Sequence, residues 1–233
     1  GSILDCALDA TVTRGSATAL PWPDASFDAV ITDPPYYDNI QYAALSDFFY
    51  VWLKRTIGHL YSEHFSADVS PKKSEAVASP WRHKSKADAK FAYEQMMARS
   101  FAEAHRVLKP GGQMTVVYAH KTTLGWSTLV DALRHAGFTV VEAWPLDTER
   151  TVRVRAQESA ALASSIFLVA RKRGGAETGS YEDEVRPELE RIVRERVDSL
   201  WKMGITGADL VIAAVGAGLR AFTRFARVEY ANG

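Results

Sequence analysis

The sequence is poor in cysteine, and Cys6 is the single thiol among its 233 residues. One thiol cannot form an internal disulfide or a zinc cluster of several cysteines, so we expect a reducing, cytoplasmic setting and no metal site. An excess of either charge is lacking too, because 28 lysine and arginine residues balance 28 acidic ones. Net charge therefore gives no sign of nucleic-acid binding, and any basic surface must be local.

Signals for secretion and for membrane insertion are also lacking. Gly1-Ser2 is not followed by a charged and then apolar segment, and we expect no membrane partner. The composition, 47% hydrophobic and 24% charged residues, fits an α/β domain with a sizeable core. We predict a main domain over residues 1–173, a flexible linker over 174–180 and a helical extension over 181–233.

A short stretch, Asp33-Pro34-Pro35-Tyr36, organises the chain. It follows the apolar run 27–32, which is rich in β-branched residues, and its two prolines cut that run. This pattern predicts a buried parallel strand whose carboxyl end opens into a loop, the position where open α/β sheets bind ligands. Aspartate and proline are also ordinary turn residues, so a simple strand-ending turn is the alternative for these four residues alone.

The residue types of this loop suit one kind of chemistry. An exocyclic amine on a nucleobase is a poor nucleophile because its lone pair is delocalised into the ring. The Asp33 carboxylate can accept one of the amine hydrogens and the Pro34 carbonyl the other. Pro35 would fix the loop, and Tyr36 would offer a flat face on which an extruded base can stack, an interaction of about 1–3 kcal/mol.

Several motifs flank this tetrapeptide. Residues 15–30 run straight into it, and Val107-Leu108-Lys109-Pro110-Gly111-Gly112 looks like a helix-to-strand turn shared by very many methyltransferases. Together they resemble the amino-methyltransferases, S-adenosylmethionine enzymes that methylate adenine N6 or cytosine N4 in DNA. The continuation over 37–42 and 45–53 is similar to the large adenine-specific DNA methylase-like proteins that carry a zinc ribbon elsewhere in the chain. The resemblance covers roughly residues 3–173 and extends to the C-terminal tail.

The resemblance implies an α/β fold, namely the C-terminal part of a Rossmann-like methyltransferase sheet that ends in an antiparallel hairpin and is followed by a helical extension. It also implies S-adenosyl-L-methionine as cofactor, DNA as partner and adenine N6 as the methylated amine. The catalytic residues would be Asp33, Pro34, Pro35 and Tyr36. Guanine-N2 methylation of RNA is the alternative enzymatic function. A nucleic-acid-binding or assembly module without turnover is the alternative outside catalysis.

By the same resemblance, Ser16, Ala17 and Asp33 contact the cofactor. Family members often carry an acidic residue where this chain has Ser16, and a plain strand-to-loop turn is an equal alternative there. Near the end of the chain, Gly216-Ala217-Gly218 is weak evidence for a cofactor loop, so we expect these glycines to be packing residues.

Candidates for contacts to the nucleic acid lie in three segments. The candidates just after the tetrapeptide are Tyr37, Asn39 and Tyr42, which could bind a flipped base or pack in the core. The irregular segment 61–90 gathers basic residues around Trp81, so it could touch phosphates, although acidic residues dilute its charge and a solvated loop is the alternative. A third, arginine-containing segment could also face phosphates. The substrate-binding candidates are Tyr37, Asn39, Tyr42, Lys72, Lys73 and Arg153.

Periodicity predicts the remaining elements. Apolar residues at helical spacing predict a helix over 42–56 with most of its aromatics in the core, and further helices over 125–136 and 185–201. Another helix presents Tyr93, Met97 and Phe101 on one face and stops before Pro110. We expect strands over 10–14, 113–119, 138–144 and 164–171, the last two as an antiparallel hairpin, and a local hydrogen-bonding role for His120.

In this chain the segment 15–30 comes directly before the tetrapeptide, and in that order of motifs a glycine-rich cofactor turn lies upstream of both. No such turn precedes Asp33 here. Such a turn belongs to a βαβ unit of roughly 30 or more residues, and the region before residue 10 is too short for it. We therefore expect a fragment that binds S-adenosylmethionine weakly by itself and leaves a sheet edge and apolar helix faces uncovered. An upstream part of a longer polypeptide, or a dimer partner, would cover them.

Overall fold

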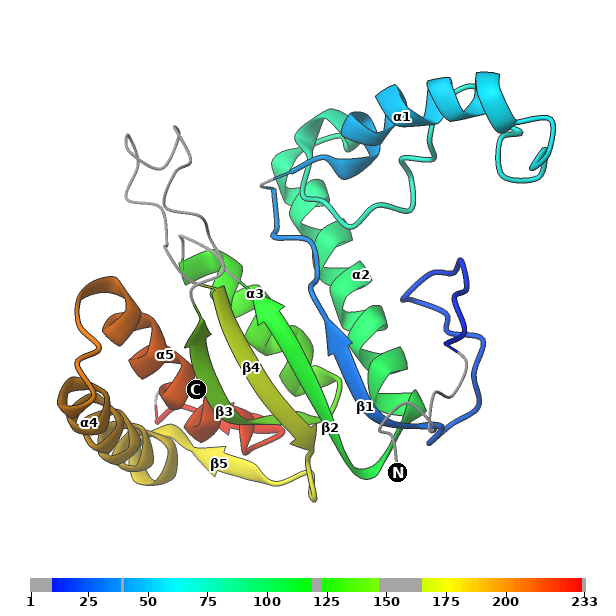
Figure 1. Ribbon diagram of the computed structural model, residues 1–233. Coiled ribbons are helices and arrows are strands. Elements are labelled where there is room, and N and C mark those ends of the chain that lie inside the picture. Colours follow the sequence, from blue (N-terminus) through cyan, green and yellow to red (C-terminus); the bar gives the residue numbers. More distant parts are fainter. Residues whose placement is uncertain (1–9, 39, 119–122, 147–164, 232–233) are drawn as a thin grey trace, which may run out of the picture.

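The computed structural model describes residues 10–38, 40–118, 123–146 and 165–231. Its main sheet has four strands in the order β1-β2-β4-β3 (Figure 1). These strands are β1 Phe27–Thr32, β2 Leu108–Tyr118, β3 Phe138–Leu146 and β4 Ser165–Lys172. β1 runs parallel to β2, whereas β4 is antiparallel to both of its neighbours. The predicted α/β class and the antiparallel pair β3 and β4 are therefore confirmed.

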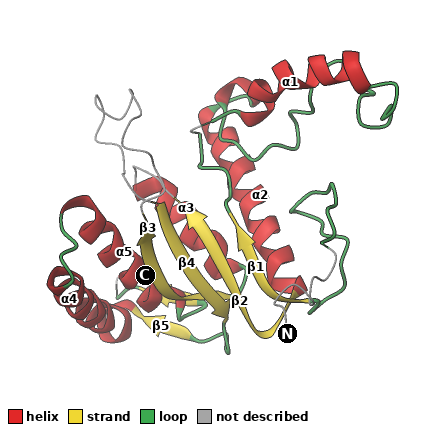
Figure 2. Cartoon of the chain, in the orientation of Figure 1, coloured by secondary structure: helices red, strands yellow, loops and turns green. Residues whose placement is uncertain are grey.

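Helices alternate with the strands and then follow them (Figure 2). Before β3 these are α1 Tyr42–Ile57, the 3-10 turn η2 Pro80–Arg82, α2 Lys86–Val107 and α3 Thr123–His135. After β4 come β5 Thr178–Ser180, the turn η4 Tyr181–Val185, α4 Arg186–Lys202, α5 Gly207–Thr223 and β6 Arg227–Glu229. β5 and β6 form a separate parallel pair. Among the described residues, the helices are too short or too polar to cross a membrane.

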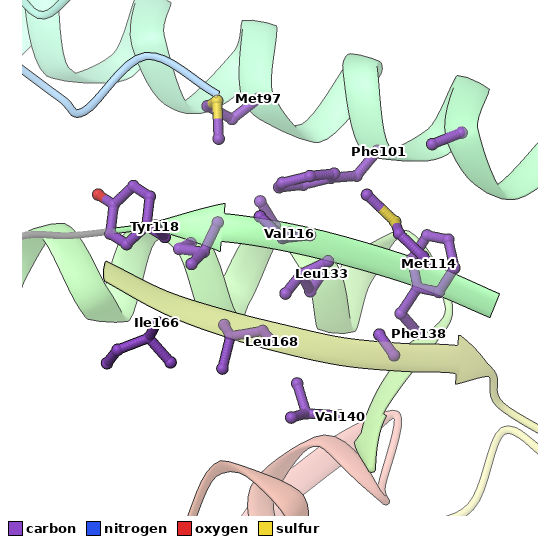
Figure 3. Close-up of a cluster of buried hydrophobic side chains, with 14 of the residues drawn as sticks. Met97, Phe101, Met114, Val116, Tyr118, Leu133, Phe138, Val140, Ile166 and Leu168 are labelled. Atoms are coloured by element: carbon purple, nitrogen blue, oxygen red, sulfur yellow. The ribbon is translucent and has the colours of Figure 1, made fainter. Parts of the chain in front are cut away.

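One face of the main sheet packs against α2 and α3 (Figure 3). Met114, Val116 and Tyr118 point to this face from β2, at the two-residue spacing by which a strand presents one side, and all three are buried. Met97 and Phe101 of α2 lie in the same cluster, as the predicted helix face requires. Burial of each such side chain contributes roughly 1.5–3 kcal/mol, so this face holds the sheet and α2 together.

The ends of the two covering helices follow from local sequence. The Ser85 hydroxyl accepts a hydrogen bond from the backbone N–H of Asp88 at 3.1 Å and so caps the first turn of α2. α2 ends at Val107, shortly before Pro110, which cannot continue a helix. α3 ends before Gly137, whose φ of 88° lies in the left-handed region that glycine adopts without strain. That turn leads directly into β3.

β1 is an edge strand in the part of the chain that the structure describes. It pairs with β2 on one side only, and Ile31 is 76% exposed. The predicted parallel pairing is confirmed, but the prediction of a buried strand is wrong because the outer side of β1 has no partner strand here. On the sheet face turned away from α2 and α3, Val117, Phe167 and Val169 are only half-buried.

α1 begins at Tyr42 as predicted, yet none of its residues is buried. Its polar side is attached to the following loop, since Asp47 accepts a hydrogen bond from the Ser70 backbone N–H at 2.9 Å and the Tyr50 hydroxyl donates to the Ala67 carbonyl at 2.9 Å. The prediction that most of its aromatics belong to the core is therefore wrong, because the apolar side faces outward. The exposed apolar residues of this side are Tyr42, Leu45, Phe48, Phe49, Trp52 and Leu53.

α5 packs along β3 and attaches the C-terminal helices to the sheet. The Thr223 hydroxyl accepts a hydrogen bond from the Val140 backbone N–H at 2.8 Å. A Cβ at Gly216 would clash with the Cβ of Ala143, and one at Gly218 would lie 2.7 Å from a methyl carbon of Leu189 on α4. Both glycines therefore permit close packing within and around a helix, as expected, and they form no loop.

One prediction for an irregular segment is wrong. Residues 10–14 form no strand, because no neighbouring strand pairs with them, and only Ser16 and Ala19 make an isolated bridge nearby. The segment 174–180 stays a predicted linker; its last three residues form β5, which pairs with β6, and the Ala226 backbone N–H donates to the Glu177 carbonyl at 2.9 Å. Local composition does not reveal a partner strand so far along the chain. His120 lies outside the described residues.

Candidate active site

The candidate site begins where β1 ends. The arrowheads of β1 and β2 point towards the N-terminal half of α2 and towards α1, so the carboxyl ends of both parallel strands lie at this side of the molecule (Figure 1). Asp33 is exposed, Pro34 is buried, and Pro35 and Tyr36 are half-buried. The carboxylate thus faces solvent from an anchored loop, at the sheet edge where open α/β folds bind ligands.

A tyrosine of α2 clamps this loop. The Tyr93 hydroxyl donates to the Pro35 carbonyl at 2.7 Å and accepts from the Tyr37 backbone N–H at 3.1 Å. Tyr93 is buried, and burial raises the pKa of its hydroxyl, so the group stays protonated and keeps its hydrogen to donate. Its ring also meets the Tyr37 ring edge-on at a centroid distance of 5.2 Å. One side chain therefore fixes the backbone on both sides of Tyr36.

The segment that precedes η2 braces the loop a second time. The Ala78 backbone N–H donates to the Tyr37 carbonyl at 2.9 Å, and Glu75 accepts from the Ala43 backbone N–H at 3.0 Å. Tyr37 has a φ of 47°, in the left-handed region that residues other than glycine adopt at a cost of about 1–3 kcal/mol. The hydrogen bonds from Tyr93 and Ala78 offset that strain and hold the loop in one shape.

Two acceptors of the loop are left for a ligand. Within the described ranges, no hydrogen bond reaches the Pro34 carbonyl. The Asp33 carboxylate forms no ion pair there and has the Tyr36 hydroxyl as its side-chain partner, which leaves further acceptor positions on its two oxygens. Proline keeps its carbonyl while lacking an N–H, so Pro34 presents an acceptor without a competing donor. A primary amine has two hydrogens to donate, and this carbonyl and carboxylate are consecutive in the chain. Binding of an amine by this pair stays a prediction.

Tyr36 lies between the loop and the sheet. Its ring meets the Tyr118 ring of β2 edge-on at a centroid distance of 5.2 Å. Burial, followed by a hydrogen bond to the Asp33 carboxylate, raises the pKa of the Tyr36 hydroxyl above its ordinary range, while a hydrogen bond with Ser165 acts in the opposite direction. The hydroxyl is therefore protonated and can orient the carboxylate. Stacking of a base on the Tyr36 ring stays a prediction.

Sequence reasoning missed the aromatic side chains that support Tyr36 and Tyr37. Tyr118 lies edge-on to Trp126 as well as to Tyr36, and its hydroxyl donates to the Gly125 carbonyl at 3.1 Å. Tyr93 was predicted only as part of an apolar helix face. A buried tyrosine hydroxyl needs a hydrogen-bond partner, so a tyrosine on such a face was the available signal for a residue that holds a loop.

The other predicted contact residues differ in their surroundings. Tyr42 and Lys73 are exposed, whereas Lys72 forms an ion pair with Asp47 at 2.7 Å and donates to the Ser70 carbonyl at 3.1 Å. The hydrogen bond from Lys72, followed by that from the Ser70 hydroxyl, lowers the pKa of Asp47 to about 2. Lys72 therefore braces α1 within the protein. Two further candidates lie outside the described residues, namely Asn39 and Arg153.

The turn formed by Ser16 and Ala17 is exposed and lies apart from the Asp33 loop in its hydrogen bonding. The Ser16 and Thr18 hydroxyl oxygens are 2.8 Å apart, and the Leu20 backbone N–H donates to Glu103 of α2 at 2.8 Å. Where the chain is described, no hydrogen bond joins this turn to Asp33. The described residues also contain no group of three or more His, Cys, Asp or Glu that could hold a metal ion.

Comparisons with known proteins do not identify a family. No protein-family model matches the chain, and no curated protein gives a significant match. Among solved structures, TTHA0409 from Thermus thermophilus, a candidate DNA modification methylase, is similar at 18% identity and a TM-score of 0.38, over 78% of this chain and 61% of that chain. Its complex with S-adenosyl-L-methionine gives 17% identity and a TM-score of 0.36, over 78% and 64%. The [4+2]-cyclase SpnF is similar at 16% identity and a TM-score of 0.34, over 70% of this chain and 56% of that chain. The chain thus spans less than two thirds of each of these structures.

Proposed function

We propose that this chain carries the amine-binding site of an S-adenosylmethionine-dependent methyltransferase that acts on an exocyclic base amine of nucleic acid, with adenine N6 of DNA as the favoured target. The observation that carries the proposal is the pair Asp33 and Pro34. An exposed carboxylate is followed by a carbonyl that no donor reaches among the described residues, at the carboxyl end of a parallel strand. The flanking motifs that resemble the amino-methyltransferases support the same reaction and DNA as the substrate.

In this proposal the amine donates one hydrogen to the Asp33 carboxylate and the other to the Pro34 carbonyl. Acceptors that draw the two N–H bonds out of the base plane free the nitrogen lone pair from the ring. S-adenosylmethionine supplies, when bound, an activated methyl group on a positively charged sulfur. The methylated nitrogen must then lose one proton, and the exposed Asp33 carboxylate can accept that proton and pass it to water.

The rigidity of the loop supports the proposed mechanism. Tyr93 and Ala78 hold the backbone around Tyr36, so the two acceptors are in place before the amine arrives. Positioning of this kind contributes roughly 7–11 kcal/mol to catalysis in favourable cases. Pro35 restricts the loop, the Tyr36 hydroxyl orients Asp33, and the Tyr36 ring is the proposed platform for the extruded base.

The described residues fit the amine more completely than the cofactor. Ser16 and Ala17 are the residues that we propose beside the cofactor adenine, yet their turn is exposed. No glycine-rich turn precedes β1 within the described part of the chain. We therefore propose that a longer polypeptide or a second copy completes the cofactor site. The outer side of β1 and the exposed apolar side of α1 are the surfaces that it would cover.

Methyl transfer from tritiated S-adenosylmethionine tests the proposal, with the chain inside its full-length polypeptide and with DNA and tRNA as separate acceptors. Digestion and mass spectrometry then identify the methylated nucleoside. We expect N6-methyladenine in DNA. N2-methylguanine in tRNA would assign the chain to the RNA alternative, and binding of nucleic acid without transfer of label would assign it to a module without turnover.

A further inference from the structure

Trp81 has an unusual position for a large aromatic side chain. It is the central residue of η2 and is 92% exposed. It lines an open hollow of about 650 Å³ together with Arg82, His83, Lys84 and Asp88. A single exposed apolar side chain is ordinary on a protein surface, so the surroundings of Trp81 carry the argument.

The backbone under Trp81 is firmly held. Pro80 restricts the first position of the turn, and Arg82 forms an ion pair with Glu75 in which both side chains are largely buried. Arg82 also donates to the Lys72 carbonyl at 3.2 Å. The Trp81 ring therefore projects from a rigid turn, and little backbone entropy is lost when a ligand stacks on it.

The same turn is hydrogen-bonded to the candidate active site. Just before η2, the Ala78 backbone N–H donates to the Tyr37 carbonyl, and Arg82 reaches the Gln41 side-chain oxygen at 3.5 Å. Both of these partners belong to the loop that follows Asp33. Trp81 therefore lies on the segment that braces the proposed amine-binding loop.

The charges around Trp81 favour a polyanion. Three of the four acidic residues in this segment have a basic partner in the fold: Asp68 pairs with Lys54, Glu75 with Arg82, and Glu63 lies 3.6 Å from His64. The fourth, Asp88, lines the hollow and accepts a hydrogen bond from the neutral Ser85 hydroxyl, so it is the one acidic charge in the hollow lining. In contrast, three lysines near Trp81 are exposed and form no ion pair with any described residue. They are Lys73, Lys84 and Lys86.

We propose that Trp81 stacks on an unpaired base that neighbours the target base, while the phosphates on either side lie near Lys84 and Lys86. This inference rests on the proposed function. It assumes that the Asp33 loop binds the target base of a nucleic-acid strand, and it adds that the base next to the target is unpaired. Every base has a π-face, so the contact selects unpaired over paired bases and does not select sequence.

The test is binding of a labelled single-stranded oligonucleotide and of the matching duplex, measured by fluorescence anisotropy at several salt concentrations. Trp81→Ala removes the stack and should weaken single-strand binding by roughly 5- to 150-fold, with a smaller loss for Trp81→Phe and for the duplex. The salt dependence should stay as in the wild type, because no phosphate contact is lost. Lys84→Ala should instead flatten the logarithmic salt slope by about 1.

Trp201→Ala is the matched control, since Trp201 is 62% exposed on α4, at the far side of the sheet from α1 (Figure 1). The affinity of this variant for the single-stranded oligonucleotide should stay within about 2-fold of the wild-type affinity. Thermal melting should confirm that all variants remain folded, because Trp81 and Trp201 are exposed.

Wild-type affinity in a folded Trp81→Ala variant would overturn the inference, as would equal losses in the two tryptophan variants. The outcome is separable from that of the proposed function. Methyl transfer by the wild type, together with unchanged binding by Trp81→Ala, would refute the stacking and leave the reaction standing. Binding that depends on Trp81 without any methyl transfer would refute the reaction and leave the stacking standing.

Discussion

Tyr93→Phe is the change that probes the loop clamp most cleanly. It removes one oxygen and keeps the buried ring, so the packing of α2 is preserved. The Pro35 carbonyl loses its 2.7 Å bond, and the Tyr37 N–H keeps only a weaker bond to the same Pro35 carbonyl at 3.2 Å. The variant therefore leaves two half-buried backbone groups poorly satisfied.

The size of the effect follows from that loss. A buried polar group that loses its partner costs about 1–3 kcal/mol. For a chain of this length, each 1 kcal/mol lowers Tm by about 2–4 °C, so we expect Tm to fall by about 2–12 °C. Methyl transfer should fall further, by up to roughly 100-fold in kcat/KM at a temperature where the variant is folded, because small displacements of positioned groups are costly.

Differential scanning calorimetry and single-substrate kinetics would measure the two effects. Tyr230→Phe is the control, because Tyr230 is exposed at the far end of the chain and its hydroxyl holds no described loop. The control should change the free energy of unfolding by no more than about 0.5 kcal/mol. A Tyr93→Phe protein with the Tm and the kcat/KM of the wild type would refute the clamp.

Three further predictions address the rest of the fold. Gly216→Ala should lower the urea midpoint of unfolding, because overpacking against Ala143 costs about 1–3 kcal/mol. At an open helix position the same change would instead stabilise the fold by up to about 1 kcal/mol. A raised midpoint would therefore contradict the close packing of α5 on β3. The pKa of Asp47 is lowered to about 2, so its carboxylate stabilises the fold above about pH 4 and this contribution is lost as the pH falls through about 2. The difference in urea midpoint between the wild type and Asp47→Asn should accordingly be larger at about pH 6 than at about pH 3, and equal differences would argue against the ion pair. Finally, the exposed apolar side of α1 should make the wild-type chain associate as its concentration rises, which sedimentation velocity would measure. The double variant Phe49→Glu, Trp52→Glu should remain monomeric at the same concentrations. Identical sedimentation profiles for the two proteins would assign that side to solvent.

Local signals predicted the elements that lead to the site. Prolines after a β-branched run placed the end of β1, and alternating or helical spacing placed β2, α2 and the pair of β3 and β4. These patterns act over a few residues, so one sequence is enough to detect them. The tetrapeptide chemistry also depends only on residue type, because proline always keeps a carbonyl and lacks an N–H.

Long-range relations were not available from the sequence. Tyr93 is 56 residues from the Tyr37 N–H that it holds, and no local pattern records that bond. The aromatic spacing of α1 indicates which side of the helix is apolar, but the same spacing occurs whether or not another element covers that side. Lys72 resembled a free cation in the sequence, yet the fold brings Asp47 to it.

In the proposed reaction, the Asp33 carboxylate holds the amine during methyl transfer. The most direct measurement is the single-turnover rate of methyl transfer to DNA by Asp33→Ala in the full-length polypeptide, beside the wild type and Asp38→Ala. Both aspartates are exposed in the same loop, so both variants should fold and bind DNA. We expect the rate to fall by at least roughly 100-fold for Asp33→Ala, which is the scale of losing one positioned polar group. For Asp38→Ala we expect a rate near that of the wild type. A folded Asp33→Ala protein that transfers methyl groups at the wild-type rate would contradict this role of Asp33.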